Sequence, residues 1–199
     1  GGDIRHLELR KHGSVADPKQ PLVLLQNVAD KTYVAQTGLF DAKNSELPNH
    51  HTRFTLPASA MQLADGQDQL EVRLEATTAA GVKVARIFTF KRGSYLIDTR
   101  YEINNGSNQS ISPSAYFRLL RDGHAPEGES RMASTFTGVA MYTEQNKYQK
   151  ISFEDIDKNK AKFTNACDNG WIGMVQHYFV AAWLPDNTAK PGEDCSKQA

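Results

Sequence analysis

The middle of the chain alternates between apolar and polar residues with a period of two. The clearest example is Leu-Glu-Val-Arg-Leu-Glu-Ala at residues 70–76. This pattern predicts a strand with one buried face and one face in solvent. The same period recurs from Tyr95 to Ile103, and turn residues flank that segment at Gly93 and Gly106. Together these segments predict an antiparallel meander with short turns.

Further short strands follow the same logic along the chain. They are expected at residues 32–36, 53–56, 82–90, 114–120, 138–143 and 148–153. Helical periodicity is scarce, and its best short candidate is residues 153–158. Many short strands with regular turns predict an all-β sandwich or barrel, mostly antiparallel, with little helix. We expect a single domain over residues 1–199, with a loop or frayed end at 186–199.

Residues 169–185 form the most apolar stretch, with Trp171 and Trp183 near its two ends. A membrane-spanning helix needs about 18 apolar residues, and Gln176 and His177 interrupt this stretch. We therefore expect either two central strands, at 171–175 and 180–184, or one strand broken by a bend. Its nearly continuous apolar character predicts that both faces are covered and that both indole rings are largely buried.

Composition narrows the class of protein. The 199 residues suffice for one domain with a real core. They carry 23 Lys and Arg against 23 Asp and Glu, a net charge of zero. This balance argues against nucleic-acid binding, which depends on neutralising phosphates, and against a basic membrane-surface module. Cys167 and Cys195 would pair in an oxidising compartment and stay thiols in the cytosol, and the sequence leaves both open.

No spacing in the chain predicts a catalytic, cofactor-binding or metal-binding residue. His50 and His51 are the only close histidine pair, and neighbours on a strand point to opposite faces, so we do not expect them to converge. His124 lies near Asp122, and His177 lies in the apolar stretch. Either could be a general base beside a carboxylate or an ordinary polar residue. Nucleophile-elbow and phosphate-binding motifs are absent from the sequence.

One segment carries a candidate interface. Residues 142–150 interleave tyrosine with lysine, and exposed tyrosines are favoured at protein interfaces. We expect the partner surface on residues 135–150, with Tyr142, Lys147, Tyr148 and Lys150 as the candidate partner-binding residues. The alternative is an ordinary hairpin with tyrosines on its rim.

Several sequence blocks, in order and over nearly the whole chain, resemble one family. They are Gly-Gly-Asp at residues 1–3, Tyr-Val-Ala-Gln-Thr-Gly-Leu at 33–39, Phe-Thr-Phe-Lys-Arg-Gly-Ser-Tyr at 88–95, Thr-Phe-Thr-Gly at 135–138 and the tryptophan-rich stretch at 170–185. Together they resemble the large periplasmic domain of the YidC membrane protein insertases of Gram-negative bacteria.

The resemblance implies a β-supersandwich similar to the galactose mutarotase fold. It also implies a periplasmic domain, in which Cys167 and Cys195 could be oxidised, within an inner-membrane protein whose other segments lie before and after this chain. The implied function is a non-catalytic scaffold that contacts accessory subunits of the Sec translocon and nascent membrane proteins, with no cofactor and no nucleic acid. We expect the isolated domain to be monomeric. The alternative is a sugar-binding or aldose-epimerising sandwich.

Overall fold

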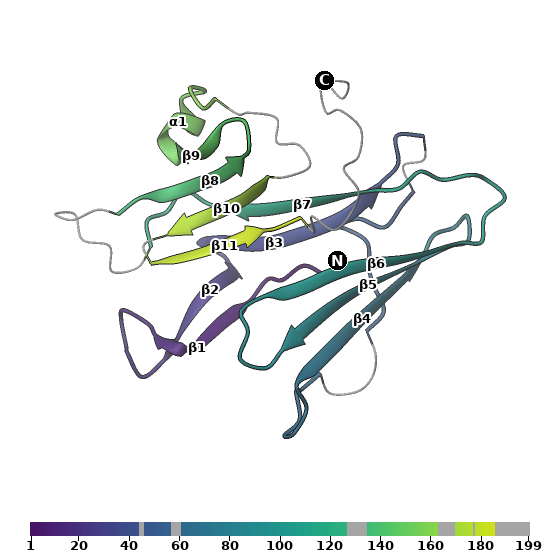
Figure 1. The fold of residues 1–199 in the computed structure, drawn as a ribbon, viewed down its shortest axis with the longest axis horizontal. Helices are drawn as coiled ribbons and strands as arrows, with labels where there is room; N and C mark the ends of the chain where they lie inside the picture. The colour runs from purple at the N-terminus through teal and green to yellow at the C-terminus, as the bar shows by residue number, and fades with distance from the viewer. Residues whose placement is uncertain (44–45, 57–60, 127–134, 163–169, 177, 186–199) are drawn as a thin grey trace. The chain divides into compact units, whose positions relative to one another are not determined.

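The computed structural model describes residues 1–43, 46–56, 61–126, 135–162, 170–176 and 178–185, which form β-strands and one short helix (Figure 1). The elements are β1 (Leu7–Gly13), β2 (Pro21–Val28), β3 (Lys31–Phe40), β4 (Gln69–Thr77), β5 (Val82–Lys91), β6 (Ile97–Asn105), β7 (Ser114–Arg121), β8 (Thr137–Thr143), β9 (Lys147–Ser152), α1 (Phe153–Asp157), β10 (Trp171–Gln176) and β11 (Phe179–Trp183). The all-β prediction is confirmed.

The strands form three sheets, ordered β1-β2-β3-β7, β11-β10-β8-β9 and β4-β5-β6. The chain divides into two compact units. The first comprises residues 1–3 and 36–117, and the second comprises residues 4–35 and 118–199. Strands β3 and β7 contribute residues to both units.

In the first unit, β4, β5 and β6 form the predicted antiparallel meander. Leu70 pairs with Phe90, and Leu74 pairs with Arg86, so both partners of each pair share one face of the sheet. Leu74 is buried, whereas the alternating charged residues of β4 are exposed. The glycine at the turn before β6, Gly93, has a φ of +73°. The alternation and the turn both match the sequence-based prediction.

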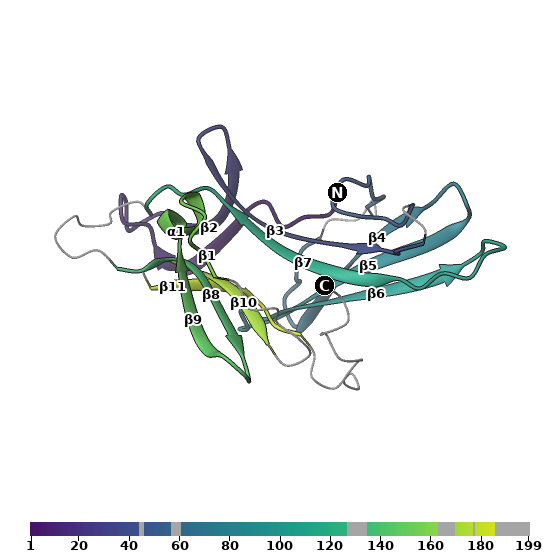
Figure 2. The same cartoon turned by 90° about the horizontal axis from the view of Figure 1, so that it is seen from above.

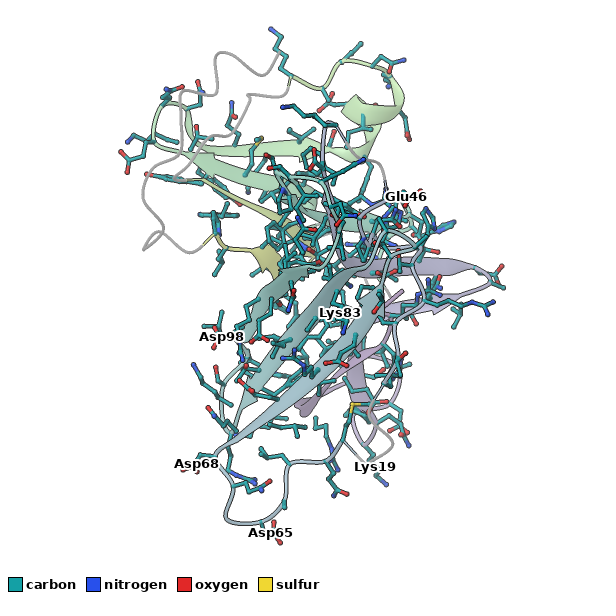
Figure 3. All side chains as sticks on the ribbon, turned by 90° about the vertical axis from the view of Figure 1, so that its right-hand side faces the viewer. Lys19, Glu46, Asp65, Asp68, Lys83 and Asp98 are labelled. Carbon is teal, nitrogen blue, oxygen red and sulfur yellow. The ribbon has the colours of Figure 1, made fainter. Side chains whose placement is uncertain are left out.

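The opposite face of this sheet is a charged ladder. Its ion pairs join Arg100 to Glu71 at 2.8 Å, Arg73 to Glu102 at 2.6 Å and Lys91 to Asp98 at 2.8 Å. By register the face holds four cations and four carboxylates, namely Arg73, Lys83, Lys91, Arg100, Glu71, Glu75, Asp98 and Glu102. Figure 3 labels Lys83 and Asp98 on it. Under these side chains Ile87 is only 1% exposed.

The inner face of the same sheet buries a cation. Arg86 is 0% exposed and donates hydrogen bonds to the carbonyl oxygens of Gly1 at 3.1 Å, Gly2 at 3.0 Å and Thr37 at 2.7 Å. Its guanidinium also lies over the Phe54 ring, 4.7 Å from the centroid. Acceptors for both terminal nitrogens, Nη1 and Nη2, compensate for burial of the charge, whereas the buried Nε has no hydrogen-bond partner in the described part of the chain. Arg86 therefore fastens the first residues of the chain to β5 and β3.

The second unit is a sandwich of two four-stranded sheets. Leu9, Leu24, Leu25, Tyr33 and Ala35 come from β1, β2 and β3, and they form one buried cluster with Met174 from β10. Because both sheets contribute to one core, they pack face to face. Figure 2 shows the β8–β9 hairpin with α1 following it. In α1 the Ser152 hydroxyl caps the helix by accepting from the Asp155 N–H at 3.1 Å.

The apolar stretch forms two strands, as predicted, but it is less buried than predicted. Trp171 and Trp183 are half-buried, and Ile172 and Val180 are 42% and 54% exposed. The expectation that both faces are covered was wrong, because Ile172 and Val180 lie on opposite faces of the β10–β11 pair and both are exposed to solvent. The Trp183 indole donates to the Arg118 carbonyl oxygen at 3.1 Å, which satisfies its polar atom.

Two smaller predictions also need correction. Residues 53–56 form no strand and contribute only an isolated bridge from Thr55 to Glu75. Strand β2 (Pro21–Val28) was not anticipated. Within the described ranges, no helix combines the length and the apolar character needed to cross a membrane.

Candidate functional site

An exposed aromatic cluster lies on the face of the β8–β9–β10 sheet that points away from the core. The register pairs Trp171 with Tyr142 and Tyr142 with Tyr148, so the three rings form one row across three strands. The Tyr142 and Trp171 centroids are 6.5 Å apart with an interplanar angle of 9°. Those of Tyr148 and Trp171 are 6.0 Å apart. Tyr148 is 50% exposed, and Tyr142 and Trp171 are half-buried.

A lysine and a phenylalanine extend this row. The Lys150 ammonium lies 4.9 Å from the centroid of the Phe136 ring and 6.0 Å from that of Tyr148. Phe136 lies against Gly138, where an added Cβ would meet the Phe136 ring at 2.8 Å and the Ile151 carbonyl oxygen at 2.5 Å. Glycine therefore allows the Phe136 ring and the Ile151 carbonyl to approach this closely. We call this surface, comprising Phe136, Tyr142, Tyr148, Lys150 and Trp171, the aromatic face.

The structure brings together three of the four predicted partner-binding residues. Tyr142, Tyr148 and Lys150 belong to the aromatic face, whereas Lys147 lies at the turn into β9 with a φ of +54°. Alternation along β9 assigns Lys147 to the opposite face from Tyr148. Phe136 lies in the segment predicted from the sequence but was not singled out, and its contact with the Lys150 ammonium places it in this surface. Trp171 was missed, because only the strand register places it beside the tyrosines.

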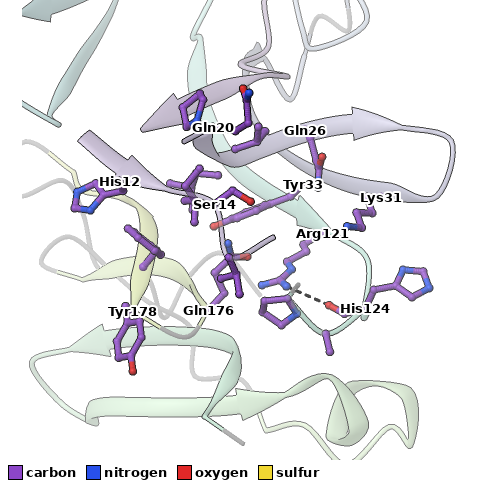
Figure 4. A pocket seen from close by; sticks show the side chains of 18 of the residues that line it. His12, Ser14, Gln20, Gln26, Lys31, Tyr33, Arg121, His124, Gln176 and Tyr178 are labelled. Atoms are coloured by element: carbon purple, nitrogen blue, oxygen red, sulfur yellow. Dashed lines mark hydrogen bonds between the residues drawn. The ribbon is translucent and has the colours of Figure 1, made fainter. Parts of the chain in front are cut away.

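A cleft lies at one end of the sandwich in the second unit (Figure 4). This cleft, of about 630 Å³, is lined by β1, β2, the start of β3, the residues at and just after the end of β7, and the junction of β10 and β11. Lys31, Arg121 and His124 lie toward one end, and His12 and Tyr178 lie toward the other. Its size is that of a small-molecule site.

Arg121 and Tyr33 form the fixed part of the cleft. The Arg121 guanidinium lies 5.3 Å from the Tyr33 ring centroid and 5.7 Å from that of Phe153. It also donates to the His124 carbonyl oxygen at 3.1 Å. Burial raises the pKa of Tyr33 to about 12, although the Arg121 charge opposes this. The Tyr33 hydroxyl therefore stays protonated at neutral pH, and it donates to the Met174 carbonyl oxygen at 3.3 Å.

The cleft also holds the one histidine–carboxylate pair that the sequence suggested. The His124 Nδ1 lies 3.0 Å from Asp122 Oδ1, and the His124 backbone N–H donates to the same oxygen at 3.0 Å. The Thr32 N–H donates to the other oxygen of the carboxylate. Burial acts to raise the pKa of Asp122, but these hydrogen bonds outweigh it and the pKa lies below its ordinary value. Asp122 is thus an ionised structural acceptor.

The remaining candidates separate into those that the structure describes and those that it does not. The His50 and His51 rings lie in a turn with centroids 3.9 Å apart, so the expectation that they diverge was wrong, since strand alternation does not apply there. The described residues contain no group of three or more metal-binding side chains. His177, Cys167 and Cys195 lie outside the described residues, so the predicted disulfide stays a prediction.

The fold defines a class: an all-β sandwich domain, here with an aromatic face on one of its sheets. A sequence model of the YidC periplasmic domain family matches residues 1–195. The chain is 51% identical over 184 residues to the membrane protein insertase YidC of Laribacter hongkongensis, covering 92% of this chain and 33% of that relative. The chain belongs to the YidC periplasmic domain family, and it is therefore a periplasmic domain.

Other relatives agree. The membrane protein insertase YidC of Dechloromonas aromatica is 51% identical over 185 residues, covering 93% of this chain and 33% of the relative. That of Nitrosospira multiformis is 48% identical over 185 residues, covering 93% and 32%. The chain thus spans about one third of the length of the curated relatives that it matches.

Proposed function

We propose that this domain is the non-catalytic interaction scaffold of an inner-membrane protein insertase. Insertion would take place in the part of the protein that this chain does not span, and this domain would contact accessory subunits of the Sec translocon and emerging membrane proteins. The observation that carries the proposal is the aromatic face. Tyrosine, tryptophan and a flanking cation are the residue types enriched where proteins bind one another.

The contribution of the aromatic face follows from its geometry. The row from Tyr148 to Trp171 offers rigid rings on a sheet, so little side-chain entropy is lost when a partner covers them. Lys150 adds a cation at the edge of the row, where it would favour an acidic partner and raise the rate of encounter. The partner surface predicted from the sequence is therefore redefined here around Trp171 and without Lys147.

Charge reversal in the full-length insertase tests this surface. Lys150→Glu should abolish copurification of the Sec accessory subunits, while Lys147→Glu, on the same hairpin but off the aromatic face, should leave it intact. Lys83→Glu on the charged ladder is the control in the first unit. Unfolding midpoints of all three variants should match the parent chain. Equal copurification of the Lys150→Glu and Lys147→Glu variants would show that the aromatic face is not the contact.

The absence of catalysis is the second part of the proposal. Aldose epimerisation needs an acid and a base placed on either side of a sugar. In the cleft, Asp122 is occupied by three N–H donors, and the His124 side chain is 72% exposed. We expect no mutarotation of aldoses above the buffer rate. A rate enhancement that disappears in the His124→Ala variant would replace the scaffold proposal with the sugar-active alternative.

A further inference from the structure

The cleft in the second unit has an excess of positive charge that the rest of the chain lacks. Its lining includes Lys11, Lys31 and Arg121 as cations against Asp122 as the one carboxylate. The whole chain is neutral, with 23 cationic and 23 anionic side chains. The three cations come from β1, β3 and β7, which are distant in sequence, so the fold itself gathers them around the cleft.

The single carboxylate, Asp122, does little to cancel the positive charge that a ligand in the cleft would meet. Asp122 is held by the Thr32 and His124 backbone N–H groups and by the His124 ring. Its oxygen atoms are therefore used within the loop, and their negative charge is partly neutralised by these donors. What the cleft presents to an incoming molecule is chiefly its lysines, the guanidinium and the histidine rings.

The arginine is held in a fixed position at the cleft. Contacts of its guanidinium with the Tyr33 and Phe153 rings hold it in one plane, and the donation to the His124 carbonyl fixes its rotation. Its Nη1 is buried and its Nη2 already donates to the His124 carbonyl oxygen, so the guanidinium acts on a carboxylate in the cleft mainly as a fixed positive charge. Figure 4 places Lys31 at the same end of the cleft, where its ammonium adds a second positive charge.

One part of the remaining wall is apolar, although Ser14, Gln20, Gln26 and Gln176 also line the cleft. Leu22, Leu24 and Phe179 line it together with the Tyr33 ring, and Leu24 is 6% exposed. An apolar wall beside a cationic end suits an organic acid, whose carbon part gains from leaving water. It gives no such advantage to an inorganic anion.

We propose that this cleft binds a carboxylate carried on a small, partly apolar molecule. Arg121 and Lys31 receive the carboxylate, and the Leu22, Leu24 and Phe179 wall receives the organic part. A free peptide C-terminus and an acidic sugar share this chemistry. The inference concerns a different surface from the aromatic face and does not depend on the scaffold proposal.

Isothermal titration of the full chain tests the proposal with matched probes. N-acetyl-Ala-Phe with a free carboxylate is compared with its C-terminal amide, and glucuronate is compared with glucose. We expect one acid of these two pairs to bind and its neutral counterpart to bind about tenfold more weakly or not at all. A binding peptide acid identifies a polypeptide source, and a binding glucuronate identifies a saccharide source.

Variants locate the binding. Lys31→Gln changes an exposed side chain at the cationic end, so it should fold normally and weaken binding by about tenfold, whereas Lys83→Gln on the charged ladder should have no effect. Arg121→Gln should abolish binding, with its unfolding midpoint recorded as a check. Three outcomes would overturn the proposal: no binding of either acid, equal binding by the Lys31→Gln and Lys83→Gln variants, or inorganic phosphate competing as well as the organic acid.

Discussion

Replacing the buried Arg86 by methionine tests how the first unit is held together. Methionine has a similar length and leaves little empty volume, so the change removes mainly the charge and its hydrogen bonds. Three carbonyl oxygens lose their donor, and the Thr37 carbonyl lies where the hydrogen bond is buried. A buried polar group left unsatisfied costs about 1–3 kcal/mol, and the Gly1 and Gly2 carbonyls are only partly buried, so each contributes less.

The expected loss of unfolding free energy for Arg86→Met is therefore about 3–5 kcal/mol. The loss of two ring contacts, to Phe54 and Tyr101, is included in that range. Arg86→Lys keeps the charge but only one donor centre, and it should recover part of the loss. Arg73→Met, on the exposed charged ladder, is the matched control and should cost less than about 1 kcal/mol.

The assay is urea unfolding followed by circular dichroism. The dependence of the unfolding free energy on urea concentration is compared between variants, because an unchanged slope shows that a shifted midpoint reports a change in stability. A second readout comes from Tyr101. Burial raises the pKa of its hydroxyl, and the nearby Arg86 charge lowers it. Removing Arg86 should raise the pKa of Tyr101 further in a spectrophotometric titration. A loss below about 1 kcal/mol for Arg86→Met, equal to that of Arg73→Met, would refute the assignment of Arg86 as the anchor of the chain start.

Three more predictions follow from the same structure. Trp171→Ala should cost roughly 2 kcal/mol in urea unfolding, less than for a fully buried tryptophan, and a cost above about 4 kcal/mol would show that the ring is covered. Gly138→Ala should lower the unfolding midpoint, since its Cβ would meet the Ile151 carbonyl oxygen at 2.5 Å, whereas Gly123→Ala, with its nearest atom at 3.8 Å, should not. The pKa of Asp122 is depressed on folding, so its contribution to stability should be present above about pH 4 and lost as the pH falls through the folded pKa. The Asp122→Asn variant should accordingly show a shallower loss of stability in acid, and an unchanged acid profile would count against its hydrogen-bonded role.

The local sequence pattern was sufficient to predict those strands that have one apolar and one charged face. In β4 the alternation of apolar and charged residues is regular, and the structure reproduces it residue by residue. Strand β2 reads Pro-Leu-Val-Leu-Leu-Gln-Asn-Val, a nearly continuous apolar run that periodicity cannot assign to strand or helix. For the apolar stretch at residues 169–185, the sequence overestimated burial. Val180 and Ile172 are exposed, and apolar character alone does not distinguish them from buried residues.

The candidate sites depended on information that pattern does not carry. Tyr142 and Tyr148 were found because they lie close together in sequence, but Trp171 joined them only through the β8–β10 register. Register is set by long-range packing and is not written in any single segment. The same applies to the cleft, whose Lys31 and Arg121 come from separate strands. Arg86 was missed because a charge in a strand is read as solvent-facing by default.

The charged ladder on β4, β5 and β6 has a consequence for long-range forces. Its four positive and four negative side chains are interleaved, so their fields cancel over a distance comparable with their spacing. Salt screens what remains beyond about 8 Å at physiological ionic strength. Anionic lipid headgroups would therefore neither draw this face in nor push it away. A domain with such a face would therefore show no electrostatic adhesion to a bilayer on that side, whatever the lipid charge.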